Sequence, residues 1–437
     1  MLFYFFVHFF GGFFIIEWFF FLLIMLFYYP LFFFIHISIS FFSKRWFFCL
    51  DYFSFLIIVL SFWIIFLSVL SRKNILKSIF SSLFIKAFSF LMIFLFLFFL
   101  SNNLLIFFFF FESSLFPTLF IIIGWGNNFD RIQSGIYLFF YTLFGSIPIL
   151  ISLYTLFFLN FRFNFFFVEF YYIYNVFYFF FIVSFLVKIP IFLFHSWLPK
   201  AHVEAPVSGS IVLAGILLKI GGYGLYRFFF IYKNFLNFNI IWIYIRIWGG
   251  LLSRIICFRQ VDLKSLIAFS SVSHMSLVII GVLIFSDISI IGSVTLIVSH
   301  GLCSSGLFFL ANIVYERSGS RNLFLNKGLT RIFPSLSLWW FIFCRFNIAC
   351  PPSLNLISEI FLITRLVSWR FFFIFFLIVL SFLGGVYNLY LFTITNHGIT
   401  FSSVYNFSIS CVIREYIILY LHFFPTFFFF LKLDFFF

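Results

Sequence analysis

Long apolar runs recur along the whole 437-residue chain, and they constrain its fold more than any other feature. Runs such as FLIIVLSFWIIFLSVL and FSFLMIFLFLFFL are separated only by short polar segments. A helix needs about 20 mostly apolar residues to cross the hydrocarbon core of a bilayer. The pattern therefore predicts an all-α protein, a polytopic transmembrane helical bundle.

The composition argues against a soluble domain and against nucleic acid as a partner. Hydrophobic residues make up 65% of the chain and charged residues only 9%, whereas soluble domains carry about 25% charged residues. The net charge is +14, but basic pairs such as Lys44-Arg45 and Arg72-Lys73 lie between apolar runs, where they anchor helix ends at a lipid bilayer. The 90 Phe residues indicate the mutational bias of a T-rich organelle genome.

Charges and turn formers divide the chain into about 13 or 14 predicted spans. One or two lie within residues 1–42, and the others cover 51–70, 83–100, 101–123, 134–160, 173–198, 207–230, 238–257, 265–285, 288–312, 333–357, 368–392 and 409–431. No polar stretch is long enough to hold a folded soluble domain. Function is therefore expected within the membrane or at its surfaces.

Two spans contain helix breakers inside apolar sequence. Pro190 follows Lys188 in the first, and Pro351 and Pro352 precede Glu359 in the second. Proline removes a backbone hydrogen bond, and hydrocarbon tolerates a broken helix only where protein or a water-filled cavity satisfies the freed groups. Paired broken helices are typical of inverted-repeat transporters. We expect N-terminal helices over 1–82, repeat halves over 83–230 and 238–392, and a C-terminal helix in 393–437.

Titratable side chains interrupt several apolar spans, one in each. An unpaired charge is costly inside a bilayer, so such residues are functional by default. For each of them, a structural polar residue with satisfied hydrogen bonds is the alternative, and it has most weight for the two histidines. The candidates are Glu112, Lys188, Lys219, His274, His300 and Glu359.

Polar residues near span ends receive simpler interpretations. Lys264 begins a span beside Asp262, which favours an anchor whose amine snorkels to the interface. His195, His202 and Glu204 around WLPKAH are expected to form interfacial hydrogen bonds rather than a metal site. The six cysteines form no CxxC, so iron-sulfur and zinc sites are not expected.

As a set, the membrane acids, amines and imidazoles favour proton movement over a single substrate pocket. Each would hold a proton transiently and respond to the charge of its neighbour. A substrate pocket would instead gather its polar groups in one place. The sequence thus predicts a proton pathway through the bundle.

The same residues lie in motifs that resemble the subunit 4 family of proton-pumping NADH:ubiquinone oxidoreductase, respiratory complex I. These antiporter-like subunits are related to multi-subunit sodium/proton antiporters. The resemblance extends roughly from Asn102 to Thr395, and its longest pieces are KIPIFLFHSWLPKAHVEAPVSGSIVLAGILLKIGGYGLYR, RQVDLKSLIAFSSVSHMSLVI, SHGLCSSGLFFLANIVYERSGSR and PPSLNLISEIFLI.

The resemblance implies antiporter-like inverted repeats and a proton relay. In that relay Glu112 controls whether Lys188 holds a proton. The proton then passes through Lys219, His274 and His300 to Glu359. The supporting residues are Pro190, Pro351, Pro352, His195 and Lys264. The resemblance also implies a multi-pass place in the mitochondrial inner membrane among other membrane-arm subunits, including sibling antiporter-like ones. No redox cofactor is expected in this chain, because NADH, FMN, iron-sulfur clusters and ubiquinone belong to partner subunits.

Two further interpretations remain open at this stage. A stand-alone cation/proton antiporter could use the same glutamate and lysine, and a purely structural membrane spacer could carry the charges without using them. Arg345, just before the second break, departs from the family pattern. It is expected either to pair with Glu359 or to lie at the interface.

Overall fold

The computed structural model describes residues 48–72, 80–126, 128–160, 175–228, 236–399 and 411–436. These ranges form helices without any strand. The helices of the first half are α3 (Tyr52–Leu70), α4 (Ser81–Leu100), α5 (Leu104–Ser113), α6 (Leu115–Trp125), α7 (Arg131–Asn160), α8 (Asn175–Lys188), α9 (Trp197–Glu204), α10 (Val207–Val212), the π-helix η4 (Leu213–Leu217) and α11 (Leu218–Arg227).

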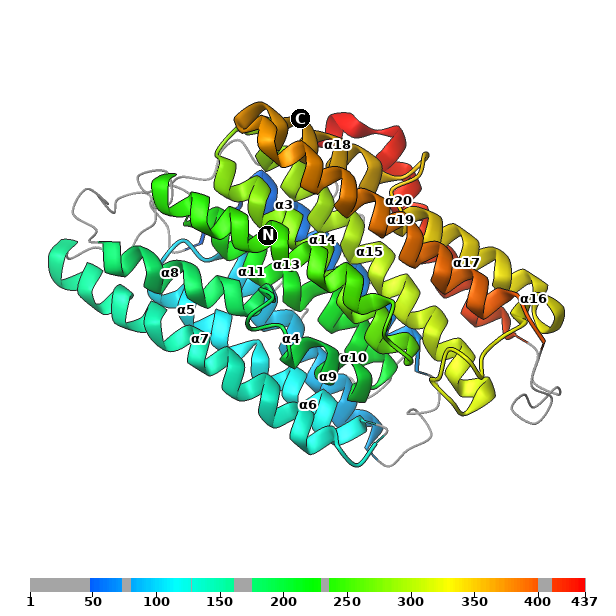
Figure 1. The fold of residues 1–437 in the computed structure, drawn as a ribbon. Helices are drawn as coiled ribbons and strands as arrows, with labels where there is room; N and C mark the ends of the chain where they lie inside the picture. Colours follow the sequence, from blue (N-terminus) through cyan, green and yellow to red (C-terminus); the bar gives the residue numbers. More distant parts are fainter. Residues whose placement is uncertain are drawn as a thin grey trace.

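The second half begins with three long helices, continues with short pieces around a break, and ends with two further long helices. They are α13 (Leu236–Cys257), α14 (Leu263–Ile284), α15 (Asp287–Ser318), α16 (Leu329–Ile332), α17 (Pro334–Asn347), α18 (Leu354–Trp369), the 3-10 turn η5 (Phe371–Phe373), α19 (Ile374–Asn396), α20 (Ile413–Leu431) and the 3-10 turn η6 (Leu433–Phe435). Figure 1 shows them as one slanted bundle, with α7 at one end and α17 toward the other.

The predicted polytopic helical bundle is confirmed. Within the described ranges, ten helical segments are long and apolar enough to cross a membrane. Each span expected beyond residue 50 corresponds to one of these or to a broken helix. The spans expected within residues 1–42 lie outside the described residues. The division into halves at 83–230 and 238–392 stays a prediction.

Both predicted breaks occur, but the second one divides two helices at a point inside the span predicted over 333–357. The span expected over 173–198 divides into α8 and α9, because α8 ends at Lys188 and Pro190 has no N–H to continue it. The span expected over 333–357 ends as α17 at Asn347, and a new helix, α18, starts at Leu354 after Pro351-Pro352. Glu359 therefore lies in α18, beyond the predicted boundary.

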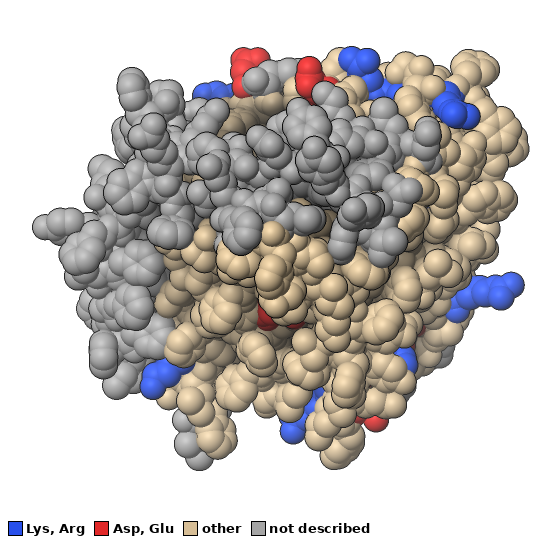
Figure 2. Space-filling model, turned by 90° about the vertical axis from the view of Figure 1, so that its left-hand side faces the viewer, with Lys and Arg blue, Asp and Glu red and all other residues tan. Residues whose placement is uncertain are grey.

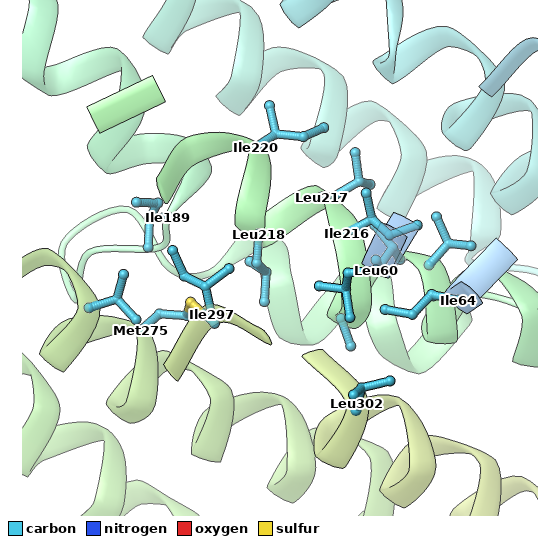
Figure 3. Packing of buried hydrophobic residues seen from close by; sticks show 14 of the residues in the cluster. Leu60, Ile64, Ile189, Ile216, Leu217, Leu218, Ile220, Met275, Ile297 and Leu302 are labelled. Carbon is cyan, nitrogen blue, oxygen red and sulfur yellow. The ribbon is translucent and has the colours of Figure 1, made fainter. Parts of the chain in front are cut away.

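The centre of the bundle is formed by α3, α10 to α11, α14 and α15, whose residues are almost all buried. Figure 3 shows the π-helical turn of this region, where Ile216 and Leu217 lie near Leu60 and Ile64 of α3. A Cβ on Gly215 would come within 2.5 Å of Ile64, so the glycine permits this close approach. Although α3 belongs to the N-terminal segment, it is part of the central core.

The outer helices keep large apolar side chains exposed. On α7 these include Phe140 and Phe144, and on α19 they include Phe375 and Phe382. Figure 2 shows a face that is largely free of charge where it is described, with Lys, Arg, Asp and Glu mainly toward its upper and lower margins. This distribution suits a body surrounded by lipid or by other membrane proteins.

Candidate proton-transfer site

The first cluster pairs Glu112 with Lys188 between α5 and α8. Lys188 Nζ lies 3.6 Å from Glu112 Oε1, and the two side chains are only 5% and 17% exposed. The same amine donates to the Phe111 carbonyl at 2.6 Å and lies 3.0 Å from the centroid of the Phe111 ring. A carboxylate, a carbonyl and an aromatic face thus surround the ammonium, and all three stabilise its charge.

Glu112 and Lys188 each lie where a helix is interrupted. Glu112 lies in the last turn of α5, which Ser114 separates from α6, and Pro117 in the first turn of α6 lacks an N–H to bond back toward Ser113. Lys188 is the final residue of α8, where the negative end of the helix dipole favours a cation. The break beside Lys188 was predicted from Pro190, whereas the interruption beside Glu112 was not.

Arg246 of α13, which the sequence analysis did not select, completes the first break. Its Nη2 donates to the Ile189 carbonyl at 3.2 Å and its Nη1 to the Pro190 carbonyl at 3.3 Å. These carbonyls have left the regular helix, and the buried guanidinium satisfies them. An arginine within the apolar run NIIWIYIRIW was the available signal.

The second cluster begins at Lys219, the second residue of α11, which follows the π-helical turn η4. Its Nζ donates to the Ala214 carbonyl of that turn and lies 3.2 Å from His300 Nδ1 on α15. Such π-helical turns are frequent at functional sites because they redirect carbonyl groups and side chains. Lys219 and His300 are therefore direct neighbours.

His300 leads to His274 and Glu359. The rings of His274 on α14 and His300 on α15 have centroids 5.4 Å apart. His274 Nδ1 lies 3.4 Å from Glu359 Oε1 on α18, and His274 Nε2 lies 3.3 Å from the Tyr387 hydroxyl. The structure thus brings four of the predicted residues into one series.

The two clusters do not touch through polar atoms in the described residues. Lys188 and Lys219 belong to adjacent helices, α8 and α11, whose contact is apolar: a Cβ on Gly221 would lie 2.5 Å from Ile189 Cγ1. Figure 3 shows Ile189 and Leu218 in this region. A proton passing from one cluster to the other needs water or a side-chain movement to cross it.

Two interpretations of single residues need correction. Lys264 is not a snorkelling anchor, because it is 2% exposed and its Nζ donates to the Ala205 carbonyl at 3.0 Å. His202 is not an interfacial hydrogen-bonder, because it is buried, its ring stacks on Phe308, and its nitrogens have no hydrogen-bond partner among the described residues. His195 is partly buried and contacts the Phe192 carbonyl through Nδ1.

Arg345 does not pair with Glu359. Its guanidinium donates to the Pro351 carbonyl at the second break, and its side chain is exposed. Glu359 is paired with His274 instead. Arg345 therefore satisfies a carbonyl that Pro351 and Pro352 leave outside a helix, much as Arg246 does at the first break. In the described part of the chain, no group of three or more His, Cys, Asp or Glu residues could hold a metal ion.

Comparison with known proteins identifies the family. Residues 101–384 match the family described as NADH:quinone oxidoreductase/Mrp antiporter, TM. The chain belongs to this family. All six titratable candidates lie within the matched residues, so the site described above is part of the family's shared region.

Individual members of the family agree with this placement. The chain is 49% identical over 348 residues to NADH-ubiquinone oxidoreductase chain 4 of Ceratitis capitata, covering 79% of this chain and 78% of that one. It is 52% identical over 317 residues to the protein of the same name from Aedes aegypti, covering 72% and 71%.

A solved structure has the same antiporter-like fold. A chain of respiratory complex I from Thermus thermophilus with bound NADH superposes with a TM-score of 0.77 at 22% identity. The match covers 87% of this chain and 81% of that one. The predicted family and fold are therefore confirmed.

Proposed function

We propose that the chain is a membrane subunit of an NADH:ubiquinone oxidoreductase and that its buried titratable residues carry protons across the membrane. The family match and the insect relatives named chain 4 support the assembly. The arrangement of the side chains supports the transport role, since a carboxylate-amine pair and a series of four titratable groups lie inside an apolar bundle.

The Glu112-Lys188 contact carries the mechanism. With Glu112 ionised at 3.6 Å, the ammonium form of Lys188 is stabilised. If a movement or a change of charge separates them, the desolvated amine favours its neutral form and releases its proton toward Lys219. The proton then passes through His300 and His274 to Glu359 and leaves the chain.

The driving energy comes from outside this chain. Moving one charge against 100 mV costs about 2.3 kcal/mol. Electron transfer from NADH to ubiquinone in partner subunits supplies it in this proposal. NADH, FMN, the iron-sulfur clusters and ubiquinone are accordingly placed in those partners, which also include sibling antiporter-like subunits. The location is the mitochondrial inner membrane, as expected for relatives of this kind.

Two substitutions in the assembled complex test the relay. Lys188→Ala and Glu112→Gln are each expected to reduce proton pumping coupled to NADH oxidation to background, because either removes one member of the pair. Lys432→Ala, which removes an exposed lysine at the end of α20, is the matched control and should pump normally. Full pumping by both relay variants would refute the assignment.

Purification distinguishes the proposed function from the other activity within the family, cation/proton antiport. A chain that migrates in mild detergent with flavin and iron-sulfur centres supports the proposed assembly. Sodium exchange by a complex without redox centres would support the antiporter instead. A purely structural spacer predicts that neutralising Glu112 and Lys188 leaves transport intact.

A further inference from the structure

Tyr387 of α19 lies where α14, α17 and α19 meet, and its hydroxyl contacts two polar side chains. It lies 3.3 Å from His274 Nε2 and 3.3 Å from Asn347 Nδ2. Asn347 Nδ2 also donates to Asn388 Oδ1 at 2.9 Å. All four side chains are buried. Of these four residues, only His274 was predicted from the sequence.

A backbone carbonyl fixes the direction of every hydrogen bond in this network. Asn388 Nδ2 donates to the Gly384 carbonyl at 2.9 Å, and a carbonyl can only accept. Asn388 therefore presents its oxygen to Asn347, and Asn347 presents its NH₂ group both to Asn388 and to Tyr387. Turning the Asn347 amide over would place two amide oxygens against each other.

The hydroxyl proton of Tyr387 then has one acceptor in the network. Its oxygen receives an N–H from Asn347, so its single proton is directed to His274 Nε2. A neutral imidazole carries one proton, and with Nε2 accepting, that proton is on Nδ1. Nδ1 is the nitrogen 3.4 Å from Glu359 Oε1. The network thus places the N–H on the nitrogen that lies nearer to the carboxylate, where no hydrogen bond to Glu359 is yet formed.

We propose that Tyr387 is a positioning residue for proton transfer, holding neutral His274 in the Nδ1–H tautomer so that its proton lies toward Glu359. The inference rests on the proposed function, because it gives Tyr387 a role in the relay. It adds a hydroxyl that controls the state of His274 without itself carrying the transported proton.

The arrangement makes protonation of His274 conditional on Tyr387. A second proton can bind only at Nε2, where the lone pair already accepts the tyrosine proton. When Nε2–H forms, it donates to the Tyr387 oxygen, and the tyrosine O–H, which stays intact, turns away from Nε2 and out of this network. When His274 later gives a proton to Glu359 from Nδ1, that N–H breaks, an O–H forms on the carboxylate, and Nε2–H remains. Restoring the original tautomer requires one proton to leave Nε2 and another to bind at Nδ1, after which the Tyr387 hydroxyl can donate to Nε2 again.

Other charged groups around His274 are fixed by the same packing and enter its pH response. They are Glu359 on α18, His300 on α15, Lys219 on α11 and Arg254 on α13. None of them lies at Nε2 in the hydrogen-bond network, which Tyr387 alone contacts there among the described residues. Removing the Tyr387 hydroxyl therefore removes the hydrogen bond at His274 Nε2 and leaves the Glu359 contact at Nδ1 in place.

The test is Tyr387→Phe in the assembled complex, with Tyr390→Phe on the same helix as the matched control. Tyr390 packs against Phe258, outside the network. Infrared difference spectra of the imidazole ring vibrations report the tautomer, and the band that disappears in His274→Gln assigns the signal. Protons pumped per NADH oxidised are measured across a pH series, and native gels report assembly.

We expect Tyr387→Phe to assemble, to show both His274 tautomers, and to pump fewer protons per NADH with an altered pH profile. Tyr390→Phe should match the unsubstituted chain in all three. An unchanged tautomer band in Tyr387→Phe overturns the inference, and so does a changed band with unchanged pumping at every pH. If Tyr387→Phe does not assemble, Asn347→Asp is tested instead. The new carboxylate accepts the hydroxyl proton of Tyr387 and so draws it away from His274. The tautomer band of His274 must therefore still change.

These results separate the inference from the function on which it rests. If Glu112→Gln and Lys188→Ala abolish pumping while Tyr387→Phe changes nothing, the relay stands and the role of Tyr387 is wrong. If all of them pump normally, the proposed function itself is wrong, whatever the tautomer of His274.

Discussion

Some buried charged residues of this bundle form an ion pair, whereas others have no oppositely charged side chain beside them among the described residues. Arg317 of α15 and Glu415 of α20 form a buried pair, with Nη2 and Oε2 2.5 Å apart. Arg254 of α13 is equally buried, but no carboxylate lies within ion-pair distance among the described residues. Breaking a buried pair leaves an uncompensated charge, whereas removing a lone buried charge relieves one.

Glu415→Gln is expected to destabilise the chain by about 3–5 kcal/mol, because Arg317 would remain charged and buried without its carboxylate. Thermal denaturation of the assembled complex measures the loss. The double variant Arg317→Met with Glu415→Leu should recover most of it, since two apolar side chains need no compensation. A double variant as unstable as Glu415→Gln would show that packing, rather than charge, holds α20 to α15.

Arg254→Ser is expected to be neutral or stabilising. The guanidinium gains a hydrogen bond to the Leu380 carbonyl, and a charged hydrogen bond contributes about 1.5–3 kcal/mol. Desolvating an unpaired ion costs several kcal/mol. The same denaturation assay checks the sign, and a clear loss of stability would mean that the guanidinium has a compensating anion outside the described residues.

At the scale of helices, the position of Lys188 depends on how closely α11 approaches the end of α8. A Cβ on Gly221 would lie 2.5 Å from Ile189 Cγ1 and 3.2 Å from the Ile189 backbone nitrogen. Ile189 directly follows Lys188, so displacing one moves the other. The glycine is therefore a condition for the Glu112-Lys188 distance.

Gly221→Ala should cost about 1–3 kcal/mol through overpacking and should lower the number of protons pumped per NADH. Denaturation and pumping assays on the assembled complex measure the two effects. Gly124→Ala on α6 is the matched control, because a Cβ there meets nothing within 4 Å. Equal behaviour of the two variants would contradict the proposed dependence.

At the scale of the whole molecule, burial falls from the centre of the bundle toward its outer helices. The segments that carry Lys219, His274 and His300 are almost wholly buried, whereas α7 and α19 expose large apolar side chains. The titratable series is thus shielded by the bundle itself, and the outer helices face lipid or neighbouring subunits.

A photoactivatable lipid probe tests this arrangement. A cysteine is introduced at one position at a time as the site to which the probe attaches. In the isolated chain, Phe375→Cys is expected to be labelled and Phe373→Cys is not. The reason is that the native side chains are 66% and 0% exposed. Protection of Phe375→Cys in the assembled complex would locate a neighbouring subunit there. Equal labelling of both positions in the isolated chain would contradict the packing of α19.

The sequence by itself determined the fold class, the two breaks at prolines and the titratable candidates. Apolar length is a local property, since each span must meet the thickness of a bilayer. Prolines such as Pro190 and Pro351 favour a helix break because they lack an N–H, although Pro148 lies inside α7 and Pro425 inside α20. A charged residue such as Lys188 within an apolar run is conspicuous for the same reason, because its neighbours in sequence cannot solvate it.

Only the tertiary structure decided which of these residues meet. Helices far apart in the chain bring Glu112 to Lys188, His300 to Lys219 and Glu359 to His274, and no sequence pattern records these pairings. The same is true of Tyr387 and of Lys264, whose surroundings depend on neighbouring helices. Span length is set by the bilayer, whereas a hydrogen bond between helices depends on the rotation and depth of both, which the packing of the whole bundle determines.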